Sequence, residues 1–197
     1  RLIPQRSLRS AIAQLLAALG TDSATKAIAD AFHSATNITD KLNYAAALNK
    51  CDSSWRKAVI DELGKLCRPH IAAYSAYLRI LAGGEHSATI EELCNEANSG
   101  SFSPSHPTHS RALYGGFTSN NAMIWTKEGL ALAKQLILEL ADLNEYVAIV
   151  VVAPLLIAQN LEEPLYAEVI STLNAISQAL ETNPGCHSLK AKLKLAL

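Results

Sequence analysis

Hydrophobic residues recur at intervals of three and four positions along most of the chain. This spacing places them on one side of a helix, so each such stretch predicts an amphipathic α-helix. Residues that end or start helices separate the stretches, among them Gly20, the pair Gly83-Gly84 and the sequence Asn183-Pro184-Gly185. The predicted helical segments cover residues 8–19, 22–32, 40–48, 55–66, 70–81, 88–94, 107–117, 127–143, 147–158, 164–180 and 188–197.

The same pattern predicts where the first helices begin and which side they bury. Gly20 ends the first segment, and Thr21 or Asp22 caps the second. Thr39 or Asp40 is expected to start the third segment. The apolar side chains expected to face a core are Leu8, Ile12, Leu15, Leu16 and Leu19 in the first segment, and Ile71, Tyr74, Leu78 and Leu81 in segment 70–81.

Two later helices also have recognisable start signals. Ser87, followed by Glu91 and Glu92, resembles a capping box, in which a serine and an acidic side chain bond the first free backbone N–H groups. Thr126 is expected to cap the long segment 127–143.

About eleven helical segments joined by short turns, with no alternating strand pattern, favour stacked antiparallel helix pairs. The sequence therefore predicts an all-α fold, an α-solenoid or superhelical array of about eleven antiparallel helices. We expect a single domain over residues 1–197. The segment lengths are irregular, so the chain matches no tetratricopeptide, ankyrin or HEAT consensus.

The most hydrophobic stretch is residues 147–158. Twelve residues are too few to cross a bilayer, which takes about 20, and Pro154 interrupts them. A solitary strand is equally unsupported, because no partner strand is predicted. We therefore expect a buried helix and no membrane contact.

Composition narrows the possible partners and the compartment. Hydrophobic residues make up 49% of the chain, charged residues 18%, and the formal net charge is −1, so nothing indicates a nucleic-acid partner. The four cysteines are widely spaced and form no C-x-x-C pair. We expect reduced, buried thiols in a cytoplasmic protein and no zinc cluster. The absence of an initiator methionine indicates a fragment or a processed product.

Residues 101–125 are the one locally unusual stretch, with prolines, histidines and a glycine pair close together. Pro104 and Pro107 keep the residues before them extended, after which Pro107 suits the first turn of a helix capped by Ser105 or His106. Arg111 follows near the start of that helix. A guanidinium beside free backbone N–H groups forms a candidate site for a carboxylate or carbonyl oxygen.

Several motifs, in order along the chain, resemble the C-terminal helical domain of bacterial-type aminopeptidase N, a family of zinc metallopeptidases. The resemblance is carried by Ser101-Phe-Ser, by the sequence from Pro107 through Arg111 to Phe117, by Asn37-Ile-Thr-Asp40, and by Leu140-Ala-Asp-Leu-Asn144 with the Val-Ala and Ala-Pro-Leu steps that follow. In the family an arginine precedes a Glu-Pro-Leu sequence, whereas this chain has Val150 and Ala153 at those positions.

The resemblance implies a zinc ion in a catalytic domain outside these residues, and the chain itself carries none of the catalytic motifs. It lacks His-Glu-x-x-His, the family's Gly-Ala-Met-Glu-Asn segment, a Gly-x-Ser-x-Gly elbow and phosphate or dinucleotide loops. His106 and His109 are three residues apart and can meet on one helix face. They form either two ligands of a metal site or a turn and a cap, and we expect no metal and no cofactor in this segment.

Two functional hypotheses follow. In the first, the chain is a non-catalytic domain that caps the chamber of a zinc aminopeptidase and positions peptide substrates, with Arg111, His106 and His109 as substrate-channel residues and the catalytic domain of the parent chain as partner. Arg111 then contacts the distal part of the peptide, or instead forms a surface or interdomain ion pair. In the second, the chain is a stand-alone α-solenoid that binds a protein or peptide without peptidase activity.

Overall fold

The computed structural model describes residues 3–197, and these residues form helices and loops with no strand. The predicted all-α fold is confirmed. The chain divides into two compact units, residues 1–96 and residues 97–197, which are described separately below. The single domain expected over residues 1–197 stays a prediction.

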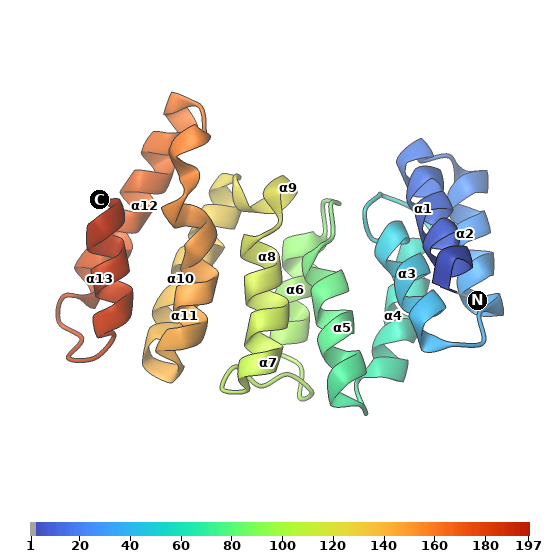
Figure 1. Ribbon diagram of the computed structural model, residues 1–197, viewed down its shortest axis with the longest axis horizontal. Coiled ribbons are helices and arrows are strands. Elements are labelled where there is room, and N and C mark those ends of the chain that lie inside the picture. Colours follow the sequence, from blue (N-terminus) through green and yellow to red (C-terminus); the bar gives the residue numbers. More distant parts are fainter. Residues whose placement is uncertain (1–2) are drawn as a thin grey trace. The chain divides into compact units, whose positions relative to one another are not determined.

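The first unit consists of six helices (Figure 1): α1 (Ile3–Leu19), α2 (Asp22–Ser34), α3 (Ile38–Leu48), α4 (Arg56–Cys67), α5 (Ile71–Ala82) and α6 (Thr89–Ala97). Helices α1, α2 and α3 pack against one another, and α3 also packs against α4 and α5. The fully buried side chains of this unit include Ile28, Phe32, Leu48, Ile60, Leu63, Leu78 and Leu93.

The starts of these helices test the predicted caps. Gly20 has a φ of +65°, a left-handed conformation that glycine adopts without strain, and Thr21 caps α2 by accepting the N–H of Ala24. The predicted start of the third helix at Thr39 or Asp40 is wrong. Asn37 is the cap, because its extended backbone lets its side-chain oxygen accept the N–H of Asp40 at 2.9 Å.

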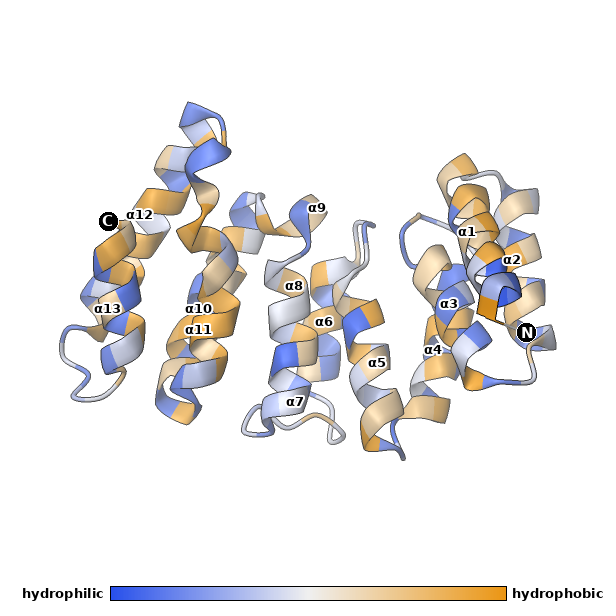
Figure 2. Ribbon diagram, in the orientation of Figure 1, coloured by the Kyte–Doolittle hydropathy of each residue, from blue (hydrophilic) through white to orange (hydrophobic). Residues whose placement is uncertain are grey.

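The apolar side predicted for the first helix faces solvent. Leu15 is 71% exposed and Leu19 67%, whereas the residues of α1 that pack into the unit are Ala13 and Ala17. Two alanines let the backbone of α1 lie close to α2 and α3, and this leaves the leucines on the other side. Ile71 of α5 is likewise exposed, contrary to prediction. Figure 2 shows how frequent hydrophobic positions are along α1.

The second unit contains α7 (Pro107–Ser110), η1 (Arg111–Gly115), α8 (Gly116–Thr118), α9 (Asn121–Ile124), α10 (Lys127–Leu143), α11 (Glu145–Leu156), η2 (Ala158–Asn160), α12 (Glu163–Leu180) and α13 (His187–Ala196). Helix α10 packs against α11 and α12, and α13 packs against α11 and α12. Segments η1 and α8 also contact α11. Thr126 caps α10 as predicted, by accepting the N–H of Gly129.

The hydrophobic stretch after Asn144 forms helix α11, whose core positions are almost fully enclosed by its neighbours. Asn144 caps the helix, and Pro154 lies in its last turn. The predicted buried helix is confirmed. Within the described residues, none of the helices combines the length and the hydropathy needed to cross a bilayer. The enclosed side chains of α11 are Val147, Ala148, Val151, Val152 and Leu155.

Candidate functional site

The unusual stretch begins as the prolines predict. His106 has an extended backbone and is the cap residue of α7, with Pro107 in the first turn. The hydroxyl of Ser110 donates a 2.6 Å hydrogen bond to the carbonyl oxygen of Pro104. This bond fixes the preceding loop against the start of the helix.

The two histidine rings meet at the start of α7, with His106 at the cap position and His109 within the helix. Their rings are stacked with centroids 4.1 Å apart, and His109 also contacts Phe102, which packs against Tyr114. His109 is buried and His106 is half-buried. Burial and, secondarily, the neighbouring His106 lower the pKa of His109. The pair is therefore part of an aromatic cluster that favours the neutral form of His109.

The helix changes geometry at Arg111. Residues Arg111–Gly115 form a π-helical turn, η1, between α7 and α8. Such turns insert one extra residue and shift the side chains that follow around the helix. A Cβ on Gly115 would lie 3.3 Å from Cγ1 of Val150, so this glycine allows the turn to pack closely on α11.

Arg111 lies on the exposed side of this turn. Its guanidinium carbon is 5.8 Å from the ring centroid of Tyr146, which is itself 60% exposed. Its backbone N–H donates to the carbonyl oxygens of Pro107 and Thr108. Among residues 3–197, no carboxylate lies within ion-pair distance of Arg111. The guanidinium is thus held by an aromatic ring and keeps its donors available.

The site offers few ligands for a metal. His106 and His109 supply two rings, and the described part of the chain has no group of three or more His, Cys, Asp or Glu side chains suited to a metal ion. A structural zinc ion takes four protein ligands and a catalytic one three. The absence of a cofactor in this segment stays a prediction.

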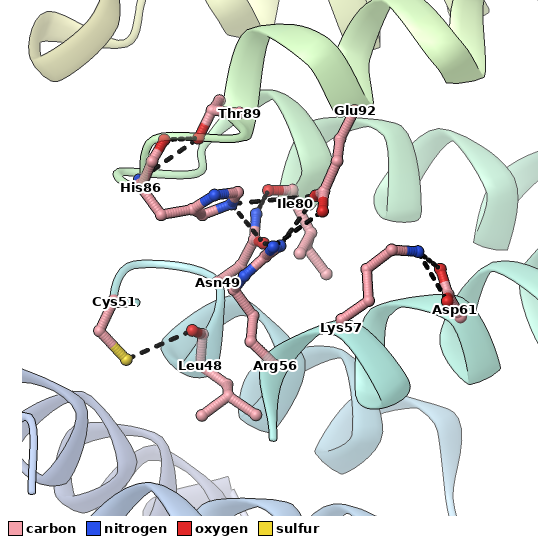
Figure 3. Close-up of polar contacts among 10 residues, drawn as sticks. All are labelled: Leu48, Asn49, Cys51, Arg56, Lys57, Asp61, Ile80, His86, Thr89 and Glu92. Atoms are coloured by element: carbon pink, nitrogen blue, oxygen red, sulfur yellow. Dashed lines mark hydrogen bonds and ion pairs between the residues drawn. The ribbon is translucent and has the colours of Figure 1, made fainter. Parts of the chain in front are cut away.

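A buried polar cluster in the first unit had not been predicted (Figure 3). Asn49 accepts hydrogen bonds from Arg56 and from Nε2 of His86, both at 3.2 Å, and donates to the carbonyl oxygen of Ile80 at 2.8 Å. Arg56 also binds Glu92 through two hydrogen bonds. Glu92, which the sequence suggested as the acid of a capping box with Ser87, is therefore engaged elsewhere.

The protonation state of His86 follows from this cluster. Asn49 Oδ1 is an acceptor, so Nε2 of His86 carries the proton, and the buried Nδ1 has no hydrogen-bond partner. Burial, followed by the charge of Arg56, lowers the pKa of His86. The imidazole is thus held in its neutral form. The sequence gives no local signal for this cluster. The one general expectation is that a charged side chain buried by the fold is paired with another polar group.

Glu96 extends the polar contacts along α6. Arg68 donates to both carboxylate oxygens, and the hydroxyls of Tyr74 and Tyr77 donate at 2.8 and 3.3 Å. Burial alone would raise the pKa of Glu96, but these hydrogen bonds outweigh it and lower the pKa. Glu96 therefore joins α6 to the end of α4 by an ion pair and to α5 by two hydrogen bonds, in addition to the burial of Leu93.

The first unit also carries an apolar groove between α3 and α5. Its volume is about 690 Å³, and its walls include Ile38, Leu42, Leu66 and Ala76. Lys41 and His70 are the basic residues of its lining. The groove was not predicted, because the residues that form it belong to segments far apart in the sequence.

The packing of successive helices on their neighbours within each unit defines a helical-repeat protein. Residues 2–183 match the family described as a domain of unknown function (DUF3458_C) with ARM repeats. The chain belongs to this family, and the predicted solenoid class is confirmed. The match also supports the resemblance to the C-terminal helical domain of aminopeptidase N.

A solved structure with a similar fold is aminopeptidase A of Legionella pneumophila in complex with aspartic acid. The TM-score is 0.75 at 18% identity, and the alignment covers 89% of this chain and 21% of that one. This chain therefore spans about a fifth of the length of the protein it matches. No curated protein matches it in sequence.

Proposed function

We propose that the chain is the non-catalytic helical domain of a zinc aminopeptidase, in which it caps the active-site chamber and restricts and positions peptide substrates. Family membership and the fold shared with an aminopeptidase support this proposal. The zinc ion and the groups that cleave the peptide bond belong to the catalytic domain of the parent chain. The contribution of these helices is to exclude folded proteins and surrounding water from that chamber.

The partner surface for the catalytic domain is the exposed aliphatic row of α1. Leu8, Ile12, Leu15 and Leu19 follow a spacing of four, three and four residues, so they form one stripe along the helix. Such a contiguous apolar stripe is unusual on the free surface of a protein. In the parent protein it is covered by the rest of the chain.

The observation that carries the substrate role is the exposed Arg111, whose guanidinium is not neutralised by any described carboxylate. It contacts the distal end of a bound peptide through a carboxylate or a backbone carbonyl. His106 lies one turn earlier and half-exposed, where it contributes a polar wall to the channel, and the buried His109 supports it from beneath. These contacts orient the peptide and leave bond cleavage to the catalytic domain.

The test is Arg111→Ala in the intact aminopeptidase. We expect KM for peptides of four or more residues to rise about tenfold, as loss of a charge-assisted hydrogen bond predicts, while single-residue amide substrates keep their kcat and KM. Arg79→Ala is the matched control, because Arg79 is an exposed arginine of the first unit. Equal effects on long and short substrates, or no effect on either, would contradict a channel role for Arg111.

The second candidate function is a stand-alone peptide-binding module, and the groove between α3 and α5 favours it. Apolar walls with a few polar groups at the edges suit an amphipathic peptide. Expression of the natural reading frame separates the two functions. A product that contains a His-Glu-x-x-His motif supports the aminopeptidase domain, and a product of about this length without one supports the module.

A further inference from the structure

We infer that Tyr146 is a positioning residue that holds the guanidinium of Arg111 ready for the carboxylate at the C-terminal end of a peptide. The two side chains then form one anion subsite. This inference rests on the proposed role of Arg111 and adds to it a second residue and a ligand class.

The first observation is the geometry of the pair. The guanidinium carbon of Arg111 lies over the face of the Tyr146 ring at 5.8 Å from its centroid. A cation over an aromatic face is attracted by the negative potential of the ring. An arginine side chain has many rotamers, and fixing one of them on binding costs conformational entropy. Because the ring already restricts the side chain of Arg111, a ligand loses less binding free energy to this cost.

The second observation is that the backbones carrying the two side chains are fixed against each other. Arg111 and Gly115 are four residues apart, as are Tyr146 and Val150, and Gly115 packs on Val150. The two contacts have the same spacing and order, so η1 and the start of α11 run in the same direction side by side. A shift of one segment along the other would break both contacts together.

The third observation concerns charge. The acidic residues at the turn before α11 are directed to other partners: Glu145 accepts the backbone N–H of Leu189 at 2.9 Å, and Asp142 accepts from the side chain of Asn183 at 2.8 Å. Arg111 is therefore not paired with either of these carboxylates, although both lie close to Tyr146 in the sequence.

These observations define the ligand class. A guanidinium offers two parallel N–H donors that match the two oxygens of a carboxylate. The ring of Tyr146 supplies no hydrogen-bond acceptor of the carboxylate type, and the Arg111 side chain is exposed, so a ligand can reach these donors. An α-carboxylate at the end of a peptide fits this arrangement, whereas a C-terminal amide supplies only one acceptor oxygen and no charge.

The experiment uses the 197-residue chain and two N-acetylated tripeptides that differ only in a free or amidated C-terminus. NMR titration follows the side-chain Nε–Hε signal of Arg111. We expect the Arg111 side-chain protons to be shifted upfield by the ring in the wild type and in Tyr146→Phe, and to lose this shift in Tyr146→Ala. Tyr146→Ala should weaken the free-carboxylate peptide about three- to fivefold, and Tyr146→Phe should leave it unchanged.

The controls separate this inference from the proposed function. Tyr146→Gln removes the ring at this exposed site but introduces a residue that favours the helix. Unchanged backbone amide spectra verify that each variant is folded. If Arg111→Ala abolishes carboxylate selectivity but Tyr146→Ala and Tyr146→Gln bind as the wild type does, the positioning role of Tyr146 is overturned and the role of Arg111 stands. If the wild type does not distinguish the two peptides at Arg111, the carboxylate subsite is overturned. A contact of Arg111 with a backbone carbonyl, which both peptides offer, is judged separately by Arg111→Ala in the intact aminopeptidase.

Discussion

Arg56 on α4 donates two hydrogen bonds of 2.8 Å to the two carboxylate oxygens of Glu92 on α6. Both side chains are largely withdrawn from solvent, with 8% and 14% of their surfaces exposed. A paired, bidentate contact of this kind fixes direction as well as distance. The contact therefore fixes the orientation of α6 relative to α4 within the first unit.

Removal of one partner of this pair is expected to be costly. Glu92→Gln leaves the charge of Arg56 buried and should lower the free energy of unfolding by about 3–5 kcal/mol. The double variant Arg56→Met with Glu92→Leu removes both charges and should recover most of that loss. Urea unfolding of the wild type, Arg56→Met, Glu92→Leu and the double variant measures the coupling between the two residues.

A control for this cycle is the exposed pair Lys57 and Asp61, one turn apart on α4 and drawn in Figure 3. Their side chains are 61% and 51% exposed, so Lys57→Ala should change stability by no more than about 1 kcal/mol. If the losses in the free energy of unfolding were additive in the single and double variants of Arg56 and Glu92, the two residues would not be coupled. That result would contradict the paired geometry.

His86 predicts a dependence of stability on pH. Its pKa in the folded protein lies below the ordinary value of 6.5, because burial and Arg56 oppose its charge, although Glu92 and Asp52 act in the other direction. A histidine whose pKa is lowered by folding stabilises the fold above pH 6.5 and loses this contribution as the pH falls below it. Unfolding below pH 6.5 should therefore be accompanied by proton uptake at His86.

The measurement is thermal unfolding of the wild type and His86→Gln between pH 5 and 8. The variant should show a shallower decline on the acidic side. The decline should not vanish, because the pKa of the buried His109 is also lowered. His70→Gln, a change at an exposed histidine, should leave the profile unchanged. An identical acidic slope in His86→Gln would disprove the assignment to His86.

Gly129 is expected to tolerate no side chain. A Cβ at this position would lie 2.1 Å from the carbonyl oxygen of Met123 and 2.9 Å from that of Ile124. These are backbone atoms, so they cannot rotate away, and Gly129→Ala should cost about 3 kcal/mol or more. Gly100→Ala is the matched control, since a Cβ there meets nothing within 4 Å. Chemical denaturation of both variants tests the contrast.

The aliphatic stripe of α1 gives different expectations for the separate chain and for the parent protein. In the 197-residue chain, Leu15→Gln should change stability by no more than about 0.5 kcal/mol, since Leu15 is exposed. Leu63→Ala, in the fully buried core, should cost about 2–5 kcal/mol. In the parent protein, where we propose that the rest of the chain covers this stripe, Leu15→Gln should be destabilising. A large loss for Leu15→Gln in the chain alone would mean that this side chain packs within the first unit.

The helices were predictable because their limits depend on neighbouring residues. Gly20 and Thr126 act at their own positions, and Pro107 favours a helix start. The buried side of α1 was not predictable in the same way. Periodicity identifies an apolar stripe, but it does not distinguish a stripe that faces its own core from one left free while two alanines make the contact.

In the candidate site too, the contact between residues close in sequence was predicted and the contact between different helices was not. The contact between His106 and His109 was expected from their separation of three residues, and it forms with His106 at the cap of α7 and not within the helix. The contact between Arg111 and Tyr146 joins different helices and depends on the close approach at Gly115. No local pattern carries that information, so sequence reasoning found the arginine and missed the ring beneath it.

Asn37, the cap residue of α3, is also a sequence match for N-linked glycosylation. Asn37, Ile38 and Thr39 form an acceptor sequence for an N-linked glycan. In the folded chain the amide nitrogen of Asn37 donates to the Asp40 carboxylate at 2.8 Å, while its oxygen accepts the backbone N–H of the same residue. Sugar attachment and the first turn of α3 therefore compete for one amide group, and the folded helix shields that group from the transferase.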